Sequence, residues 1–192
     1  MTDDTDGKPP FYGLDALAQL VPANRPAPVE RWNPPYCGDA GLEIRADGTW
    51  FHQGRPIPRP ALVRLFASVL RKDDDGKTYL VTPAEKVDVQ VADAPFLAVE
   101  LRAAGEGEGQ DLHLRTNLDD WVRIDEAHPL RFAAEATGGL KPYVTVRGRL
   151  EARLVRPVYF ELAGLVVSRA EQPGVWSGGL WWPFQGDDRA DT

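Results

Sequence analysis

Residues 82–86, Thr-Pro-Ala-Glu-Lys, contain the side chains best suited to chemistry. They separate two stretches of strand type, 79–82 and 87–91, and polar loops at strand ends often carry functional groups on a rigid base. Glu85 offers an acceptor and Lys86 a donor to a polar ligand, and Glu85 would act as a general base if burial raised its pKa. An ordinary turn with a surface ion pair fits the same residues, and the sequence leaves both interpretations open.

Residues 93–96, Asp-Ala-Pro-Phe, form a second polar interruption with the same two interpretations. Sets of metal ligands are harder to find. His52, His113 and His128 have no second His or Cys at metal-ligand spacing, and Cys37 is the only cysteine. The sequence therefore gives no reason to expect a metal site.

Three segments resemble known catalytic or ion-binding motifs, but each lacks residues that its motif requires. Residues 73–76, Asp-Asp-Asp-Gly, would place Arg71 and Thr82 at the first and twelfth ligand positions of an EF-hand, where carboxylates are required. Residues 105–109, Gly-Glu-Gly-Glu-Gly, lack the P-loop lysine, and their carboxylates would repel phosphate. Ser177 lacks the preceding glycine of a nucleophile elbow. We expect no cofactor and no catalytic residue.

The charge distribution argues against polyanionic partners. The formal net charge is −7, and the two ends, residues 1–10 and 186–192, each carry −2, which leaves −3 for the body. Binding to nucleic acid or to an anionic membrane needs a concentrated basic face. Residues 59–72 are locally basic, but they fit a solvated helix face over an apolar stripe. We expect no nucleic-acid partner and no membrane partner.

The chain is expected to be cytoplasmic. It has no apolar run approaching the ~20 residues that span a bilayer, and its first residues lack the basic start of a signal peptide. A single cysteine is typical of a reducing compartment.

The pattern of apolar residues predicts a strand-rich chain with few helices. The clearest features are a hairpin around Asp47-Gly48 and a helix from Arg59 to Lys72 with Pro60 in its first turn. Residues 22–35 contain five prolines and predict an extended arm. The remaining expected elements are helices at 13–20 and 158–167, strands at 79–82, 87–91, 121–124 and 143–150, and a hairpin of 96–102 with 112–116.

The two halves of the chain share an order of residues: Asp, Trp, Pro-aliphatic, Arg, Tyr and Val-Thr. In the first half this order runs from Asp47 to Thr82, and in the second from Asp119 to Thr145, with different intervals. Chance remains one explanation. The other is a pair of related lobes with a boundary near Lys86, and a cleft between lobes is a common place for a small ligand.

Several of these segments together resemble a known family. They include Asp47-Gly48-x-Trp50, Gly54-x-Pro56-Ile57-x-Arg59, Leu80-Val81-Thr82-Pro83-x-Glu85-Lys86, Asp93-Ala94-Pro95-Phe96 and Pro142-Tyr143-Val144. The ordered series, over roughly residues 30–165, closely resembles the bacterial domain-of-unknown-function family 1285. The resemblance implies two α+β lobes with repeated motifs and a role in ligand sensing or signal transduction, with no established reaction.

The resemblance also strengthens particular residues as candidates for a site. These are Thr82, Glu85, Lys86, Asp93 and Phe96, with Arg59 and Arg147 as partners for an anion. One departure is Gly41, which stands where relatives tend to carry an acidic residue, so the adjacent loop is left out of the predicted site.

We therefore expect an α+β protein of two small strand-rich lobes, each with a helix, and mostly antiparallel sheets. The expected organisation is an N-terminal arm (1–29), two lobes (30–86 and 87–185) and a C-terminal tail (186–192).

The expected function is non-enzymatic binding or sensing of a small polar or anionic ligand between the lobes, with Trp50 or Phe96 as an apolar wall. Two alternatives stay open. One is a protein-interaction adaptor that uses the aromatic residues 176–184 or a sheet edge, and the other is a hydrolase or transferase with Glu85 or His128 as base.

Overall fold

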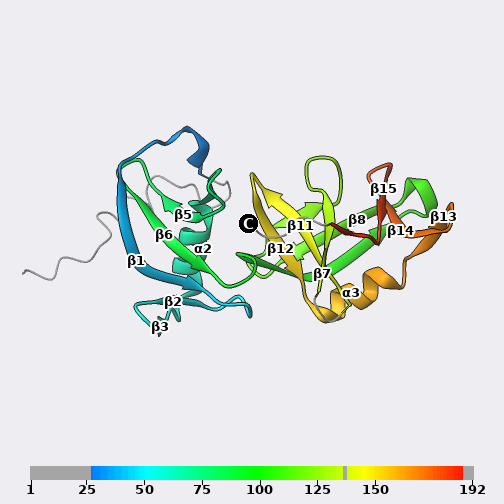
Figure 1. The fold of residues 1–192 in the computed structure, drawn as a ribbon, viewed down its shortest axis with the longest axis horizontal. Helices are drawn as coiled ribbons and strands as arrows, with labels where there is room; N and C mark the ends of the chain where they lie inside the picture. Colours follow the sequence, from blue (N-terminus) through cyan, green and yellow to red (C-terminus); the bar gives the residue numbers. More distant parts are fainter. Residues whose placement is uncertain (1–26, 136–137, 188–192) are drawn as a thin grey trace, which may run out of the picture.

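The computed structural model describes residues 27–135 and 138–187, which form two strand-rich lobes placed end to end (Figure 1). Each lobe contains one α-helix, and most neighbouring strands are antiparallel. The expected α+β architecture is confirmed. Within the described residues, no helix has both the length and the apolar character needed to cross a bilayer. The helix predicted at 13–20 lies outside the described residues.

The N-terminal lobe is built on a six-stranded sheet in the order β3-β2-β1-β6-β5-β4. Its strands are β1 (Tyr36–Ile44), β2 (Trp50–His52), β3 (Arg55–Pro56), β4 (Leu70–Lys72), β5 (Thr78–Val81) and β6 (Lys86–Val91). The 3-10 turn η1 (Val29–Arg31) precedes β1, and α2 (Pro60–Ser68) connects β3 to β4. The predicted Asp47-Gly48 turn joins β1 to β2, and glycine fits there because Gly48 has a φ of +80°.

The core of this lobe lies between α2 and the sheet. Leu42, Ile44 and Leu80 are fully buried. The ring of Trp50 packs against Phe66 of α2 with 6.2 Å between centroids. Alternation along β1 places every second side chain on this face, which explains why the strand and the helix bury complementary stripes.

The C-terminal lobe is built on a seven-stranded sheet in the order β16-β10-β11-β12-β7-β8-β9. Its strands are β7 (Phe96–Ala104), β8 (Asp111–Thr116), β9 (Trp121–Arg123), β10 (Leu130–Ala134), β11 (Leu140–Arg147), β12 (Leu150–Leu154) and β16 (Gly186–Asp187), with the 3-10 turn η2 (Gly107–Gly109) after β7. Helix α3 (Arg156–Ala163) follows β12.

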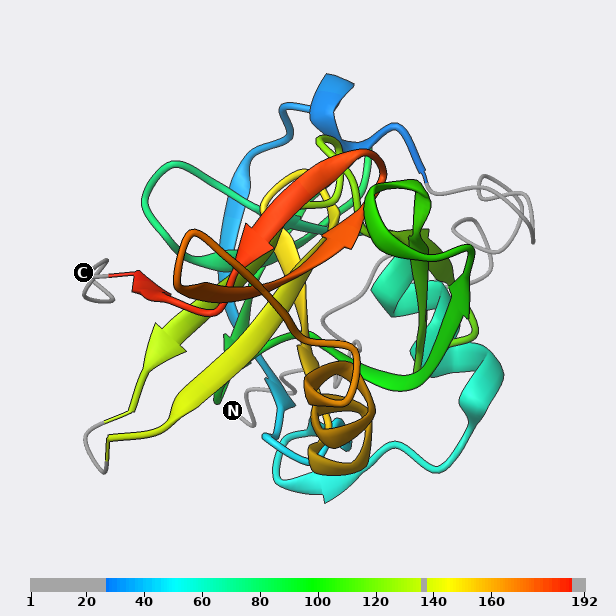
Figure 2. The ribbon, with the colours of Figure 1, turned by 90° about the vertical axis from the view of Figure 1, so that its right-hand side faces the viewer.

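A separate three-stranded sheet closes the far end of the C-terminal lobe (Figures 1 and 2). It consists of β13 (Val167–Arg169), β14 (Gln172–Ser177) and β15 (Leu180–Pro183). The buried Ser177 hydroxyl joins it to the larger sheet, because it accepts the Leu112 N–H at 2.9 Å and donates to the Ile124 carbonyl at 2.7 Å.

The strand order shows an internal duplication. Reading the N-terminal sheet as β3-β2-β1-β6-β5-β4 and the C-terminal one as β9-β8-β7-β12-β11-β10, the two orders are the same with six added to each number. In both lobes the first and last strands pair in parallel at the centre. Tyr79 in β5 and Tyr143 in β11 occupy equivalent strands, whereas Trp50 in β2 and Trp121 in β9 do not. The shared order of residues in the sequence therefore reflects the duplication only in part.

Because β1 is parallel to β6, and β7 to β12, the chain enters each lobe at one end of the sheet and leaves it at the other. Residues 82–85 precede β6, and residues 92–95, which link the lobes, follow it. The length of β6 thus separates the turn at 82–85 from the linker. In the C-terminal lobe the equivalent turn, residues 148–149, precedes β12 and lies beside the start of β7, next to the linker.

Several sequence predictions differ from the structure. Residues 186–187, expected in the C-terminal tail, form β16 beside β10, and residues 29–31 of the expected extended arm form η1. The first helix ends at Ser68, and Val69, at φ −111°, leads into β4 instead of a last helical turn. Residues 143–150 contain the end of β11, a turn and the start of β12, so they are two strands. The second helix begins and ends earlier than expected, at Arg156 and Ala163.

The boundary between the lobes also lies later than expected. A division at 86/87 would separate β6 from β1 and β5, its partners on either side in the N-terminal sheet. The structure keeps β6 with the N-terminal lobe and places the change of lobe at residues 92–95.

Candidate functional site

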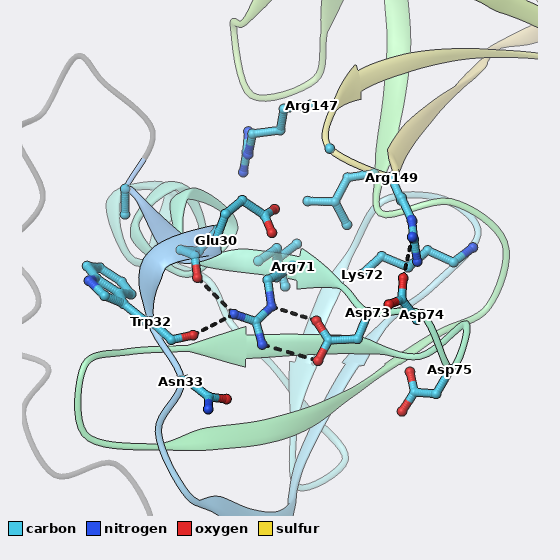
Figure 3. A pocket seen from close by; sticks show the side chains of 15 residues that line it. Glu30, Trp32, Asn33, Arg71, Lys72, Asp73, Asp74, Asp75, Arg147 and Arg149 are labelled. Carbon is cyan, nitrogen blue, oxygen red and sulfur yellow. Dashed lines mark hydrogen bonds and ion pairs between the residues drawn. The ribbon is translucent and has the colours of Figure 1, made fainter.

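A cavity of about 770 Å³ lies between the two lobes (Figure 3). The N-terminal lobe contributes residues 27–33 and 70–75, and the C-terminal lobe contributes the turn at 147–150. A smaller cavity of about 250 Å³ lies on the other side of Lys72 and Arg149, which border both. We call the two cavities together the interlobe crevice.

Arg71 is held in a fixed position at the base of the larger cavity. Its Nε and Nη2 atoms donate to the two carboxylate oxygens of Asp73, at 2.5 and 3.1 Å. Its Nη1 donates to the carbonyls of Val29 and Trp32, both at 2.8 Å. Because nearly all its donors are occupied, Arg71 shapes the cavity and has little left to offer a ligand.

Arg147 reaches across from the C-terminal lobe at the tip of β11. It donates through Nη2 to the carbonyl of Ala67 in the N-terminal lobe, and its guanidinium lies 5.2 Å from the centroid of the Phe96 ring. Its Nε is buried and has no hydrogen-bond partner within the described part of the chain. Burial lowers the pKa of Arg147, with partial opposition from the Asp120 carboxylate 3.8 Å away. A buried charged donor without a hydrogen-bond partner lowers the stability of the folded state.

The charges that line the larger cavity are balanced. They comprise four basic and four acidic side chains: Arg71, Lys72, Arg147, Arg149, Glu30, Asp73, Asp74 and Asp75. Four of these neutralise each other in the pairs Arg71–Asp73 and Arg149–Asp74. Lys72 makes no ion pair among the described residues. In Figure 3 the carboxylate of Glu30 points into the cavity, and the head group of Arg147 reaches toward the N-terminal lobe, where it is hydrogen-bonded to Ala67. The crevice thus presents separated cationic and anionic groups.

Lys86 contributes to the crevice indirectly. Its Nζ lies 4.3 Å from the centroid of the Tyr79 ring and donates to Asp73 at 3.1 Å. Burial alone would raise the pKa of Asp73, but the hydrogen bonds from Arg71 and Lys86 together lower it. Asp73 therefore stays ionised and holds both cations in place.

Two further predicted residues lie at the crevice or directly beneath it. Asp93, in the linker, lines the smaller cavity and accepts the Tyr143 hydroxyl at 2.6 Å. Arg153 also pairs with Asp93, at 2.9 Å. Phe96 is fully buried and supports Arg147, so it is a core residue beneath the crevice and does not line it.

Thr82 and Glu85 lie away from the crevice, at the opposite end of β6. The Thr82 hydroxyl accepts the N–H groups of Ala84 and Glu85, both at 3.1 Å, and so closes the turn from within. Glu85 is buried, and its Oε1 has no hydrogen-bond partner in the part of the chain that is described. Burial raises its pKa. Neither residue borders any of the three cavities found.

Trp50 and Arg59 are also separated from the crevice. Trp50 belongs to the core of the N-terminal lobe, with only 2% of its surface exposed. Arg59 is exposed and borders a third cavity, on the N-terminal lobe alone. Of the eight predicted residues, Arg147 and Asp93 line the crevice. Lys86 and Phe96 do not line it but each contacts a residue that does, Asp73 and Arg147 respectively. The other four lie elsewhere.

Sequence reasoning missed the residues that β4 brings to the crevice. Arg71 and Lys72 were assigned to a helix end. One signal was available: Asp75-Gly76 is the same tight-turn dipeptide as Asp47-Gly48, and it lies between two short stretches of strand type. Arg149 carried no signal, because only the fold places it beside Asp74.

Comparisons with known proteins agree with this architecture. Two family models match in succession: the N-terminal domain of DUF1285, a domain of unknown function, at residues 27–94, and the C-terminal domain of DUF1285, a protein of unknown function, at residues 95–184. Their junction falls in the linker between β6 and β7. No curated protein matches the chain.

Two crystal structures of DUF1285 family proteins are similar to this chain. One, from Silicibacter pomeroyi DSS-3, is 45% identical, covers 90% of this chain and 94% of its own, and superposes with a TM-score of 0.82. The other, from Shewanella baltica OS155, is 27% identical, covers 65% of this chain and 91% of its own, and has a TM-score of 0.50. The predicted resemblance is confirmed, and the chain belongs to the DUF1285 family.

Proposed function

We propose that this protein is a non-enzymatic cytoplasmic sensor that binds a small polar or anionic ligand in the interlobe crevice and passes the binding event on as a signal. The observation that carries the proposal is the cavity of about 770 Å³ lined from both lobes, at which Arg147 of the C-terminal lobe contacts Ala67 of the N-terminal lobe.

The size and placement of the crevice support this proposal. Its larger cavity, at about 770 Å³, falls within the range of small-molecule sites. Lys72 and Arg147 supply cationic groups from different lobes. A ligand that contacts both favours one relative position of the lobes, which is the physical requirement for a sensor.

Thermal-shift measurements with pools of inorganic anions, nucleotides and carboxylic acids test the proposal. A ligand of the crevice should raise the melting temperature and change the fluorescence of Trp32, which lines the cavity. Lys72→Met should remove most of this shift with little effect on the unliganded protein, because Lys72 has no ion pair to lose among the residues that the structure describes. Arg147→Met should remove the shift as well.

Arg123→Met is the matched control. Arg123 is an exposed arginine of β9 that pairs with Asp111 and lines neither part of the crevice. It should leave the ligand-induced shift unchanged. If no pool raises the melting temperature, or if Lys72→Met and Arg123→Met behave alike, the crevice is not the ligand site.

The adaptor alternative rests on the outer face of the three-stranded sheet. Trp176 and Trp181 form an edge-to-face pair there with centroids 5.3 Å apart, and Val167 nearby is 48% exposed. Deleting the C-terminal aromatics would not test this role, because Ser177 joins β14 to β8. Pull-down with Val167→Asp is a cleaner test, since partner capture should fall while ligand-induced shifts persist.

A further inference from the structure

The N-terminal lobe carries a third cavity, of about 510 Å³, that is separate from the crevice. It is formed by the β2–β3 hairpin, the loop after it and the start of α2. Its lining residues are His52, Gln53, Arg55, Pro56, Ile57, Pro58, Arg59 and Leu62. None of them borders either part of the crevice. This cavity also contains most of the Gly54-x-Pro56-Ile57-x-Arg59 segment, for which the crevice gives no role.

The charged side chains of this cavity have one sign. Arg55 and Arg59 are both exposed, and neither makes an ion pair among the described residues. No carboxylate belongs to the described lining. This differs from the crevice, where four acidic side chains balance four basic ones. Two unpaired guanidinium groups without a competing carboxylate favour an anion, and arginine binds phosphate and carboxylate through paired donors.

The backbone around the cavity is held in place. Gln53 and Gly54 form the β2–β3 turn with φ values of +49° and +75°. The Gln53 N–H donates to the Gly41 carbonyl at 2.7 Å, and the Ile57 N–H donates to the Trp50 carbonyl at 2.8 Å. These bonds fix both ends of the segment that carries Arg55, so little ordering of its backbone is needed when a ligand binds.

The rest of the wall is apolar. Ile57 and Leu62 are half-buried beside the cavity, and Pro56 and Pro58 line it between the two arginines in sequence. Proline rings present rigid apolar surface that loses no side-chain entropy on binding. The wall therefore accommodates a compact apolar group next to the charged one.

We propose that this cavity is a second binding site, for a small organic anion with a phosphate or carboxylate group on a compact apolar body. Arg55 and Arg59 bind the anionic group, and Ile57, Leu62 and the prolines contact the body. The site shares no lining residue with the crevice.

Amide NMR titration of the full chain with phenyl phosphate tests this site, at about 150 mM salt to screen non-specific attraction. Saturable shifts should be confined to residues 41 and 50–63. Benzoate should reproduce them if a carboxylate suffices, inorganic phosphate should bind more weakly, and neutral phenol should not bind. The double variant Arg55→Gln/Arg59→Gln should weaken phenyl phosphate by about tenfold or more.

Arg31→Gln is the matched control, because Arg31 is another exposed arginine of the same lobe and lines none of the cavities. It should leave the affinity unchanged, and all variants should keep the wild-type melting temperature. Shifts spread over every basic surface, or an equal loss in Arg31→Gln, would overturn the proposal. So would binding only to anionic vesicles or to DNA, which would identify this face as a polyanion surface.

Discussion

The two lobes carry equivalent hairpins with different consequences. In the N-terminal lobe, the turn between β5 and β6 is closed by Thr82 and lies at the far end from the linker. In the C-terminal lobe, the turn between β11 and β12 lies at the junction and presents Arg147 and Arg149 to the crevice. The same topology thus gives one turn whose N–H groups bond to its own Thr82 hydroxyl, and one turn that contacts the other lobe. Position relative to the junction, more than residue type, decides which copy can serve a shared site.

The largest expected effect concerns the base of the C-terminal hairpin. Phe96→Ala should lower the free energy of unfolding by about 3–5 kcal/mol, because the ring is fully buried and its removal leaves a cavity beneath Arg147. Phe160→Ala, at a ring that is 60% exposed, should change it little. Urea unfolding of both variants measures the difference. Equal effects would show that the hairpin is not supported by the core.

Thr82→Val should have the next largest effect, about 1–3 kcal/mol, because it leaves the N–H groups of Ala84 and Glu85 without their acceptor, and the N–H of Glu85 belongs to a buried residue. Thr145→Val is the matched change in β11, where the hydroxyl makes no hydrogen bond with the described residues, and it should be nearly neutral. Chemical denaturation gives both values. A loss of crevice binding in Thr82→Val without a loss of stability would contradict the separation of the two hairpins.

Glu85→Gln should stabilise the protein by about 1 kcal/mol at neutral pH and not at low pH. Burial raises the folded-state pKa of Glu85 above its ordinary value of 4.5, so the folded state binds the proton more tightly than the unfolded state. The contribution of the Glu85 carboxyl group to the free energy of unfolding is therefore fully present below pH 4.5, and it is lost as the pH rises through the folded-state pKa.

Unfolding curves of Glu85→Gln and the wild type, recorded from below pH 4.5 to neutral pH, measure the difference in their free energies of unfolding. Glu161→Gln, at an exposed site on α3, should follow the wild type at every pH. A gain from Glu85→Gln that is equal at all pH values would mean that the carboxyl group is not responsible.

The smallest effect is expected at the tip of the C-terminal hairpin. Arg149 pairs with Asp74 across the junction, but their side chains are 58% and 91% exposed. Arg149→Ala should therefore cost less than about 1 kcal/mol, and added salt should reduce the difference further. A larger, salt-independent loss would show that the hairpin tip holds the lobes together, with the crevice ligand in a lesser role.

Local sequence patterns predicted the elements whose signals are contained within about ten residues. The Asp47-Gly48 hairpin, the start of α2 at Pro60 and the β7–β8 hairpin are examples. The end of α2 was misjudged because Val69 and Leu70 continue the helical spacing, although Val69 connects α2 to the edge strand β4 and Leu70 is the first residue of that strand. Periodicity cannot distinguish these outcomes, since both bury the same two side chains.

The candidate site was harder to predict because it depends on pairing between distant segments. Arg147 was named from the family resemblance, but its position beside the N-terminal lobe follows from the parallel β7–β12 pair. The turn at 82–85 has the residue types of a site, and the parallel β1–β6 pair places it at the wrong end of the lobe for the crevice. No local pattern reports the direction of strands 50 residues apart.

The parallel pairing of β1 with β6, and of β7 with β12, has a consequence for how copies of this unit can be joined in one chain. A unit whose first and last strands run the same way can be followed by another copy without turning back, so copies add in a row and each addition creates one more junction. The sheet of β13–β15 covers the far end of the second unit, where Gln110 donates to the Trp176 carbonyl at 2.9 Å. That sheet covers the end of the second unit at which a further unit would have to be added.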